Sequence, residues 1–331
     1  MRKVLFVMEK WCDLNPNLSW TNSFHNHIDT FRQFSDDKFI FDTIHLDEAE
    51  RTYNTHIDKI LPEYCKRWGA DIVLFSLLNS SCDPSLECYK QLSEMGIYTI
   101  ILWPDAGPIW GIQEMTRLNP YINIHLSWDK VPQHDVPNNL VKSKVSNHLC
   151  LWTPQNETLY YPDTKNIDVS FLGSVAKYPD RINFINFVNN HNLNIVTGGG
   201  QRAGKLTPEA YASIIRHSKI GINFSSSQTG VFHQAKGRIF EYIASGSLLL
   251  EQRNDAIRDF FEEDKHYVAF SDFQELVDKI QYYLNNEDER LAIAQAGYEH
   301  FKQNWTSNHY WTQLMEEVDN EKNCVISSTI N

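Results

Sequence analysis

A short run of cationic, small and acidic residues, Lys236-Gly-Arg-Ile-Phe-Glu241, combines residue types that can hold an anion and a sugar. An arginine fork such as that of Arg238 suits phosphate oxygens, and a carboxylate such as Glu241 suits the vicinal hydroxyls of a ribose. As a helix, the run buries Phe240 and directs Lys236, Arg238 and Glu241 toward one end. The trio could then bind a nucleoside diphosphate by both ends. A surface ion pair between Arg238 and Glu241, at i, i+3 spacing, is the alternative interpretation.

Three loops that follow predicted strands carry small residues through which backbone amides could approach an anion. They are Gly173-Ser174, Gly198-Gly-Gly200 and the stretch from Ser225 to Gly230. A helix N-terminus behind such a loop adds its dipole. None of the loops matches a P-loop or a full G-x-G-x-x-G motif, and glycine clusters are also ordinary turn residues. Arg181, in the helix predicted after the first loop, is a further candidate cation.

The elements that position these residues alternate between apolar strands and amphipathic helices. In the second half we expect strands at 168–172, 194–197, 220–224 and 247–251, with helices at 181–189, 208–217 and 235–244. The first half has strands at 4–8, 71–77, 98–103 and 123–127, and a helix ending at Gly69. This alternation predicts a doubly wound α/β domain with a mostly parallel sheet in each half. Small ligands would bind between the carboxyl ends of the two sheets.

The domain division follows from where the alternation stops. The pattern loses its periodicity and gathers prolines near 131–165, which is typical of a crossing between domains. We therefore expect an N-terminal domain over 1–150, a C-terminal domain over 151–318, and a frayed tail over 319–331.

Charge and composition exclude several classes of partner. The 331 residues include 42 acidic and 30 basic ones, giving a net charge of −12. Such a chain offers no basic stripe to DNA, RNA or an anionic membrane. Six cysteines without a C-x-x-C pair favour a reducing compartment, and no apolar run has the length of a membrane span or a signal-peptide core. We expect a cytoplasmic protein without a membrane span, in which local cations reverse the sign of the charge wherever an anion binds.

The segment from Ile167 to about Trp311 resembles the group-1-type domain of spore-coat-maturation-type glycosyltransferases. The motifs that carry the resemblance are Asp168-Val-Ser-Phe-Leu-Gly-Ser174, Arg181, Ser218-Lys-Ile-Gly-Ile-Asn-Phe224, Lys236-Gly-Arg-Ile-Phe-Glu241, Gly246-Ser-Leu-Leu-Leu-Glu251, Tyr282-Tyr-Leu284 and Ile293-Ala-Gln-Ala-Gly297. The resemblance implies a GT-B architecture, in which two Rossmann-like domains face a cleft and no metal or other cofactor is needed. The C-terminal domain would hold a UDP- or GDP-linked sugar and the N-terminal domain an acceptor.

Carried over position by position, the resemblance gives Glu241 the donor ribose and Arg238 the phosphates, with Gly173, Ser174, Arg181, Ser225 and Lys236 around the donor. Related retaining enzymes often have a second glutamate eight positions before Glu241, where this chain has His233. His233 could hydrogen-bond the sugar or the reacting phosphate, so both retention and inversion of the anomeric centre stay open.

An inverting mechanism needs a base at a strand end of the N-terminal half, and the candidates are Asp105, His125, His25 and Glu9. Asp105 is favoured because it follows a predicted strand, in Leu102-Trp-Pro-Asp105, which is similar to a Trp-x-Asp element of the same enzymes. An aspartate after proline is also a common turn residue. Tryptophans of this half could stack on a sugar ring, although core packing is their alternative role.

The sequence thus predicts a glycosyltransferase that moves a sugar from a nucleoside diphosphate donor to the hydroxyl of a glycan or small-molecule acceptor, in glycan or surface-polysaccharide synthesis. A nucleotide-sugar epimerase or hydrolase of the same fold is one alternative. A catalytically idle nucleotide-sugar-binding module is the other.

Overall fold

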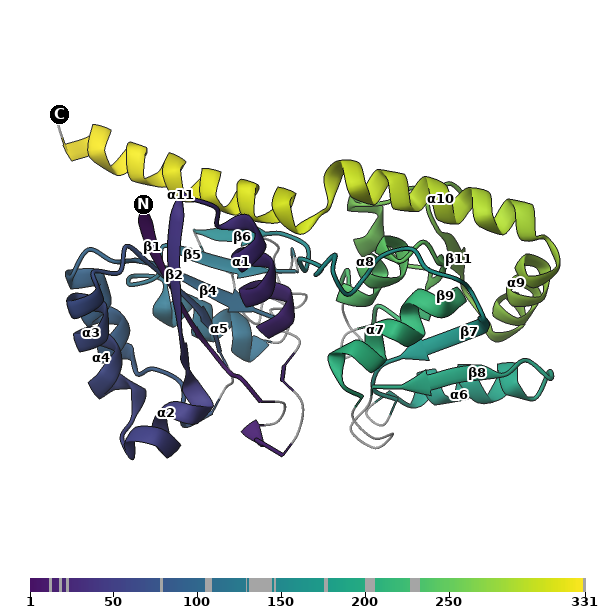
Figure 1. Ribbon diagram of the computed structural model, residues 1–331, viewed down its shortest axis with the longest axis horizontal. Helices are drawn as coiled ribbons and strands as arrows, with labels where there is room; N and C mark the ends of the chain where they lie inside the picture. Colours follow the sequence, from purple (N-terminus) through teal and green to yellow (C-terminus); the bar gives the residue numbers. More distant parts are fainter. Residues whose placement is uncertain are drawn as a thin grey trace.

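The computed structural model describes residues 1–11, 14–17, 20–21, 24–77, 80–104, 109–128, 130, 145, 147–175, 178–199, 206–226 and 233–329. It has two α/β domains side by side, each built around its own parallel sheet (Figure 1). Two doubly wound domains are therefore confirmed.

The N-terminal sheet has six parallel strands in the order β2-β1-β3-β4-β5-β6. The strands are β1 (Arg2–Met8), β2 (Phe39–His45), β3 (Ile72–Ser76), β4 (Tyr98–Trp103), β5 (Ile124–Ser127) and β6 (His148–Cys150). The helices are η2 (Phe24–Asp29), α1 (Thr30–Phe34), α2 (Leu46–Tyr53), α3 (Ile57–Trp68), α4 (Leu86–Glu94) and α5 (Ile109–Leu118). The predicted stop of α3 at Gly69 is confirmed, since Gly69 has a left-handed φ of 75° and its N–H donates to the Cys65 carbonyl at 2.8 Å.

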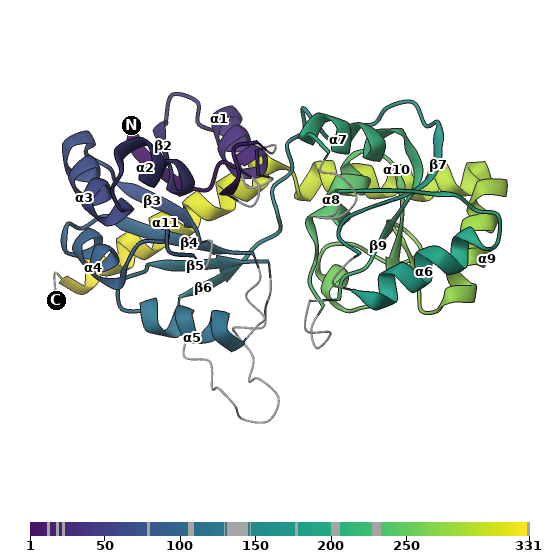
Figure 2. The same ribbon diagram turned by 90° about the horizontal axis from the view of Figure 1, so that it is seen from below.

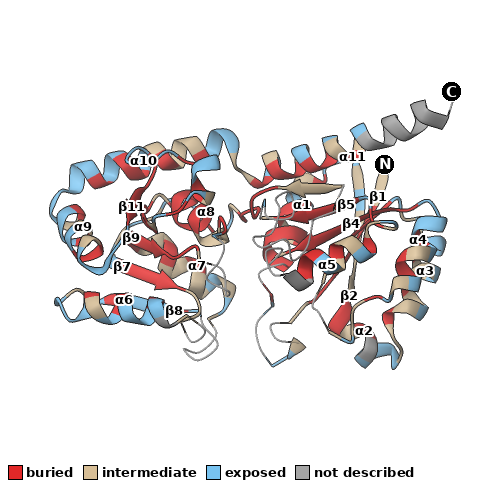
Figure 3. Ribbon diagram, turned by 180° about the vertical axis from the view of Figure 1, so that it is seen from behind, coloured by how far each residue is buried: buried red, intermediate tan, exposed pale blue. Residues whose placement is uncertain are grey.

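Side chains alternate across β1, which shows how both faces of this sheet are covered. Val4 and Phe6 pack into the core cluster that contains residues of η2, α1 and the C-terminal helix α11 (Ser307–Thr329), whereas Leu5 and Val7 pack into the cluster that contains residues of α3, α4 and α5. Figure 3 shows buried residues concentrated in the strands and exposed residues on the outer helices.

The C-terminal sheet has five parallel strands in the order β11-β10-β9-β7-β8. They are β7 (Ile167–Leu172), β8 (Ile195–Gly198), β9 (Ser218–Asn223), β10 (Leu248–Gln252) and β11 (Val268–Phe270). The helices are α6 (Pro179–Asn189), α7 (Pro208–His217), α8 (Gly237–Ala244), η5 (Ala256–Asp259), α9 (Phe273–Asn285) and α10 (Glu287–Asn304). Because β7 and β10 flank β9, the loops that follow these three strands lie at one edge of the sheet.

The long helix α11 (Ser307–Thr329) leaves the C-terminal domain and packs on the N-terminal one (Figures 1 and 2). Its Trp311 is fully buried, donates from Nε1 to Thr30 Oγ1 at 2.9 Å and meets the Phe31 ring edge-on at 4.9 Å. At the start of the helix, Glu157 accepts hydrogen bonds at 2.6 Å from both the backbone N–H and the hydroxyl of Ser307.

This packing changes the expected domain division at its C-terminal end. The apolar residues of α11 are buried in the cluster that also contains Phe6 and Phe31 of the N-terminal domain; they are Tyr310, Trp311, Leu314, Met315 and Val318. The helix also continues through most of 319–331, where we expected a frayed tail. A helix nucleated by a packed first half extends at little cost, one hydrogen bond per residue, and this accounts for the polar extension.

Among the described helices, none combines the length and the apolar content that crossing a bilayer requires.

Candidate functional site

The guanidinium of Arg238 lies at the edge of the C-terminal sheet where β7 and β9 end. It stands over the Phe171 ring at 5.0 Å, donates from Nη1 to the Leu172 carbonyl at 2.8 Å, and donates from Nε to Asn223 Oδ1 at 2.9 Å. Its remaining nitrogen, Nη2, has no hydrogen-bond partner among the described residues. Arg238 is thus held on two sides by the sheet edge and keeps one amine for an anion.

Gly173, directly after β7, makes room for this guanidinium. A Cβ atom at position 173 would lie 1.8 Å from Arg238 Nη1. The sequence predicted that the backbone amides of this loop could approach an anion. The Gly173 N–H instead donates to the Gly198 carbonyl at 2.7 Å, so this amide is already used. The Ser174 hydroxyl is buried and has no partner in the part of the chain that the structure describes.

Glu241 is buried one helical turn after Arg238 and accepts a hydrogen bond from the Tyr211 hydroxyl at 2.9 Å. Burial raises the pKa of Glu241 to about 7, against the lowering effect of the Tyr211 hydrogen bond and the Arg238 charge. The described ion pairs do not include Arg238 with Glu241, so the simple surface pair is wrong. Glu241 is therefore a buried carboxyl group whose pKa lies near neutral pH.

Arg181 is almost fully buried and ties two loops together. Its Nη1 donates to the Ser174 carbonyl at 3.1 Å, and its Nη2 donates to the carbonyls of Phe224 and Ser226, both at 3.2 Å. Burial and the nearby Arg238 charge lower the pKa of Arg181 to about 10. With both Nη atoms bonded to carbonyls, Arg181 shapes the loops after β7 and β9 around Arg238.

The remaining donor-side candidates lie around the same edge. Ser225 is fully buried and its hydroxyl donates to Glu251 Oε1 at 2.5 Å. Lys236 is the N-cap residue of α8, and its amine donates to Gln234 Oε1. His233 is exposed and forms an isolated antiparallel bridge with Ser226. Residues 227–230 of the predicted anion loop lie outside the described residues.

The favoured base, Asp105, also lies outside the described residues. His125, on β5, is fully buried, and its Nδ1 accepts a hydrogen bond from Trp103 Nε1 at 3.1 Å. Burial lowers the pKa of His125 to about 3. A neutral imidazole inside the sheet is not placed to take a proton from an acceptor, so His125 is wrong as a base.

The other two base candidates are Glu9 and His25, and His25 belongs to an aromatic cluster near the carboxyl end of β1. Glu9 follows β1 directly and is buried, while His25 lies 3.0 Å, Nδ1 to Oδ2, from Asp29. The His25 ring stacks on Trp20 at 5.8 Å, and Trp20 is 39% exposed. The described residues between β1 and η2 lie on the side of their domain that faces the C-terminal domain (Figures 1 and 2).

Three residues that the sequence interpretation did not select contact the predicted ones directly: Tyr211, Asn223 and Glu251. A signal for two of them was present. Asn223 and Glu251 are polar residues that follow apolar stretches near the carboxyl ends of β9 and β10, where a parallel sheet presents side chains to ligands. Tyr211 is a helical residue with nothing in its local sequence to mark it.

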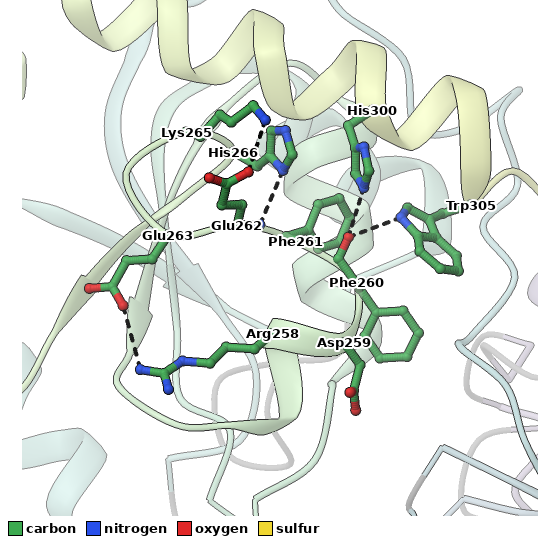
Figure 4. Close-up of a pocket in the computed structure, with 10 residues that line it drawn as sticks. All are labelled: Arg258, Asp259, Phe260, Phe261, Glu262, Glu263, Lys265, His266, His300 and Trp305. Atoms are coloured by element: carbon green, nitrogen blue, oxygen red, sulfur yellow. Dashed lines mark hydrogen bonds and ion pairs between the residues drawn. The ribbon is translucent and has the colours of Figure 1, made fainter.

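A pocket of about 650 Å³ opens beyond η5 in the same domain (Figure 4). Its wall includes His266 and His300, whose rings stack at 4.3 Å, and the Phe260 carbonyl, which accepts hydrogen bonds from His300 Nε2 at 2.9 Å and Trp305 Nε1 at 3.1 Å. None of the predicted donor residues lines it.

Comparison with known proteins decides what kind of domain carries the Arg238 edge. Residues 157–316 match the family model described as glycosyl transferase-like. The C-terminal domain is a glycosyl transferase-like domain. No curated protein sequence matches the chain.

Solved structures match nearly the full length of the chain. HepE from Anabaena, in complex with UDP and glucose, has a TM-score of 0.66 at 8% identity, with 97% of this chain and 100% of that chain covered. Sucrose-phosphate synthase from Thermosynechococcus elongatus has a TM-score of 0.64 at 9% identity, with 97% and 100% covered. A putative UDP-N-acetylglucosamine 2-epimerase from Listeria monocytogenes has a TM-score of 0.57 at 11% identity, with 97% and 96% covered. The GT-B fold is therefore confirmed.

Proposed function

We propose that this glycosyltransferase moves a sugar from a nucleoside diphosphate sugar to the hydroxyl of a glycan or small-molecule acceptor. The observation that carries the proposal is the Arg238 guanidinium, held at the sheet edge with Nη2 unpartnered among the described residues and with Glu241 one turn away. The UDP and UDP-glucose in the HepE structures support a nucleotide-sugar donor.

In the proposed reaction, Arg238 and Lys236 stabilise the charge that develops on the departing diphosphate, and no metal is required. Electrostatic stabilisation by groups held in place before the reaction usually contributes more to such catalysis than any other single effect. Glu241 holds the donor ribose. Asp105 acts as the base toward the acceptor hydroxyl if the reaction inverts the anomeric centre, and His233 contacts the sugar or the reacting phosphate.

Calorimetry with UDP and GDP tests the donor site. We expect Arg238→Ala and Glu241→Ala each to weaken binding of the preferred nucleotide at least tenfold. Glu262→Ala, an exposed residue of the same domain, serves as the control. Wild-type affinity in both site variants would contradict the assignment.

Acceptor chemistry is tested by Asp105→Asn. We expect this variant to bind the donor normally and to lose most of its transfer activity, because general base catalysis typically contributes about 10² to 10⁴ in rate. Equal kcat in the variant and the wild type would remove Asp105 from the mechanism.

A cytoplasmic location, where nucleotide sugars would reach the site directly, is part of the same proposal.

A nucleotide-sugar epimerase or hydrolase is the second candidate, supported by the structural similarity to the putative 2-epimerase. Incubation of the donor sugar without acceptor separates the two functions. Turnover of the donor alone, at the rate seen with acceptor, would favour the second candidate. Nucleotide binding without turnover under either condition would instead indicate an idle binding module.

A further inference from the structure

We propose that Glu251, near the carboxyl end of β10, is a positioning residue for Arg238. It sets which end of the Asn223 amide faces Arg238, and in this way it holds the guanidinium in the orientation that binds the donor diphosphate. This inference rests on the proposed function. Glu251 acts on Arg238 through the side chain of Asn223, which hydrogen-bonds to both.

Strand register brings the members of this chain of contacts together. Glu251 and Asn223 are paired neighbours on β10 and β9, and both are fully buried. Glu251 Oε2 accepts from Asn223 Nδ2 at 2.7 Å, while Oε1 accepts from Ser225 Oγ at 2.5 Å and from Asn254 Nδ2 at 2.9 Å. The carboxylate is therefore surrounded by donors.

The direction of the contacts follows from what each group can do. At a pH above its pKa the Glu251 carboxylate only accepts hydrogen bonds, so Asn223 must turn its Nδ2 toward Glu251. Its Oδ1 then faces the opposite way and accepts from Arg238 Nε at 2.9 Å. With Nε fixed there and Nη1 on the Leu172 carbonyl, Nη2 is left for a phosphate.

Glu251 also balances charge beneath the site. Its carboxyl group interacts electrostatically with both Arg181 and Arg238, and a buried cation without a counter-charge is costly. Burial raises the pKa of Glu251 to about 7, while the hydrogen bonds from Ser225 and Asn223 lower it. A purely structural role for Glu251 would require only this balance of charge. The test must therefore detect whether the orientation of the Asn223 amide affects phosphate binding.

Glu251→Gln keeps the shape of the side chain and introduces a donor–donor conflict. If the new amide nitrogen takes the place of Oε2, it faces Asn223 Nδ2, and if it takes the place of Oε1, it faces Asn254 Nδ2. We expect the first conflict to flip Asn223 and release Arg238 Nε. The dissociation constant for UDP should then rise at least tenfold, while that for uridine, which has no phosphate, stays within twofold.

The matched control is Glu263→Gln, the same chemical change in the same domain. Glu263 pairs with Arg253 outside this network, so we expect wild-type affinity for both ligands. A rescue variant adds Asn254→Asp to Glu251→Gln. The carboxylate introduced at position 254 can accept from the new amide, so the glutamine carbonyl again faces Asn223, and we expect UDP affinity to recover at least in part.

Calorimetry with UDP and uridine, and with GDP and guanosine as a second pair, gives separable outcomes. Wild-type protein that binds neither diphosphate contradicts the proposed function. Wild-type protein that binds a diphosphate, with equal affinity in Glu251→Gln, overturns only the inference about Glu251. Equal losses for nucleotide and nucleoside, or a double variant as weak as Glu251→Gln, would also overturn it.

Discussion

The substitution Gly173→Ala tests whether the position of Arg238, and not only its charge, sets affinity for the donor. The new methyl group would lie 1.8 Å from Arg238 Nη1 and 2.8 Å from Cζ, so one of them must move. The far end of an arginine moves more readily than the strand, and it would give up its hydrogen bonds to the Leu172 carbonyl and to Asn223. Hydrogen bonds to charged groups contribute about 1.5–3 kcal/mol, so losing one to a phosphate corresponds to a roughly 10- to 150-fold weaker dissociation constant.

The assay is titration calorimetry with UDP or GDP, alongside thermal unfolding. Gly96→Ala is the matched control, because Gly96 has a left-handed φ of 73° and nothing within 4 Å of the added Cβ. This control should lose about 1 kcal/mol of stability without a change in affinity. Folded Gly173→Ala protein that binds the nucleotide as tightly as the wild type would refute the placement of Arg238 at the phosphates.

Two further predictions concern stability. The pKa of Glu241 is about 7 in the folded protein and 4.5 in the unfolded chain, so the folded state binds this proton more tightly. The free energy of unfolding should therefore fall by about 3 kcal/mol as the pH rises from 4.5 to above 7. Urea unfolding at pH 5 and pH 8 should show this fall in the wild type and a smaller fall in Glu241→Gln. An equal change in the free energy of unfolding in both proteins would contradict the prediction. Trp311→Ala should cost about 3–5 kcal/mol, because it leaves a cavity beside Phe31 and removes the bond to Thr30. A urea midpoint unchanged from the wild type would show that α11 does not stabilise the N-terminal domain.

The fold followed from the sequence where strands are central and fully buried. β3 and β4 are apolar apart from Ser76 and Thr99 because helices cover both faces of the sheet, and such runs are easy to recognise. The edge strand β2 was missed because it is only partly buried and includes Asp42 and Thr43. The three-residue β6 is too short to show a period.

The candidate site was predictable as a set of residue types and less so as a set of contacts. Arg238 and Glu241 stand out because a cation and an acid sit together near a glycine turn. The partners that position them come from distant segments, as Tyr211 does on α7 and Glu251 on β10, and sequence spacing carries no record of such contacts. For Arg181 the residue type alone was misleading. A guanidinium suits backbone carbonyls as well as phosphates, and in this structure the Arg181 guanidinium donates its hydrogen bonds to carbonyls.

The return of α11 makes the N-terminal domain a product of both ends of the chain. Residues 1–150 emerge from the ribosome first, but the face of the sheet that holds Phe6, on which Phe31 of α1 packs, is fully covered only when Trp311 has been made. At a synthesis rate of about 5–20 residues per second, that face waits roughly 8 to 30 s for its last side chain. The C-terminal domain, whose strands are complete by residue 270, can fold within this interval. The domain that begins first is therefore expected to be finished last, and an N-terminal fragment ending at residue 150 would expose an apolar surface that the full chain keeps covered.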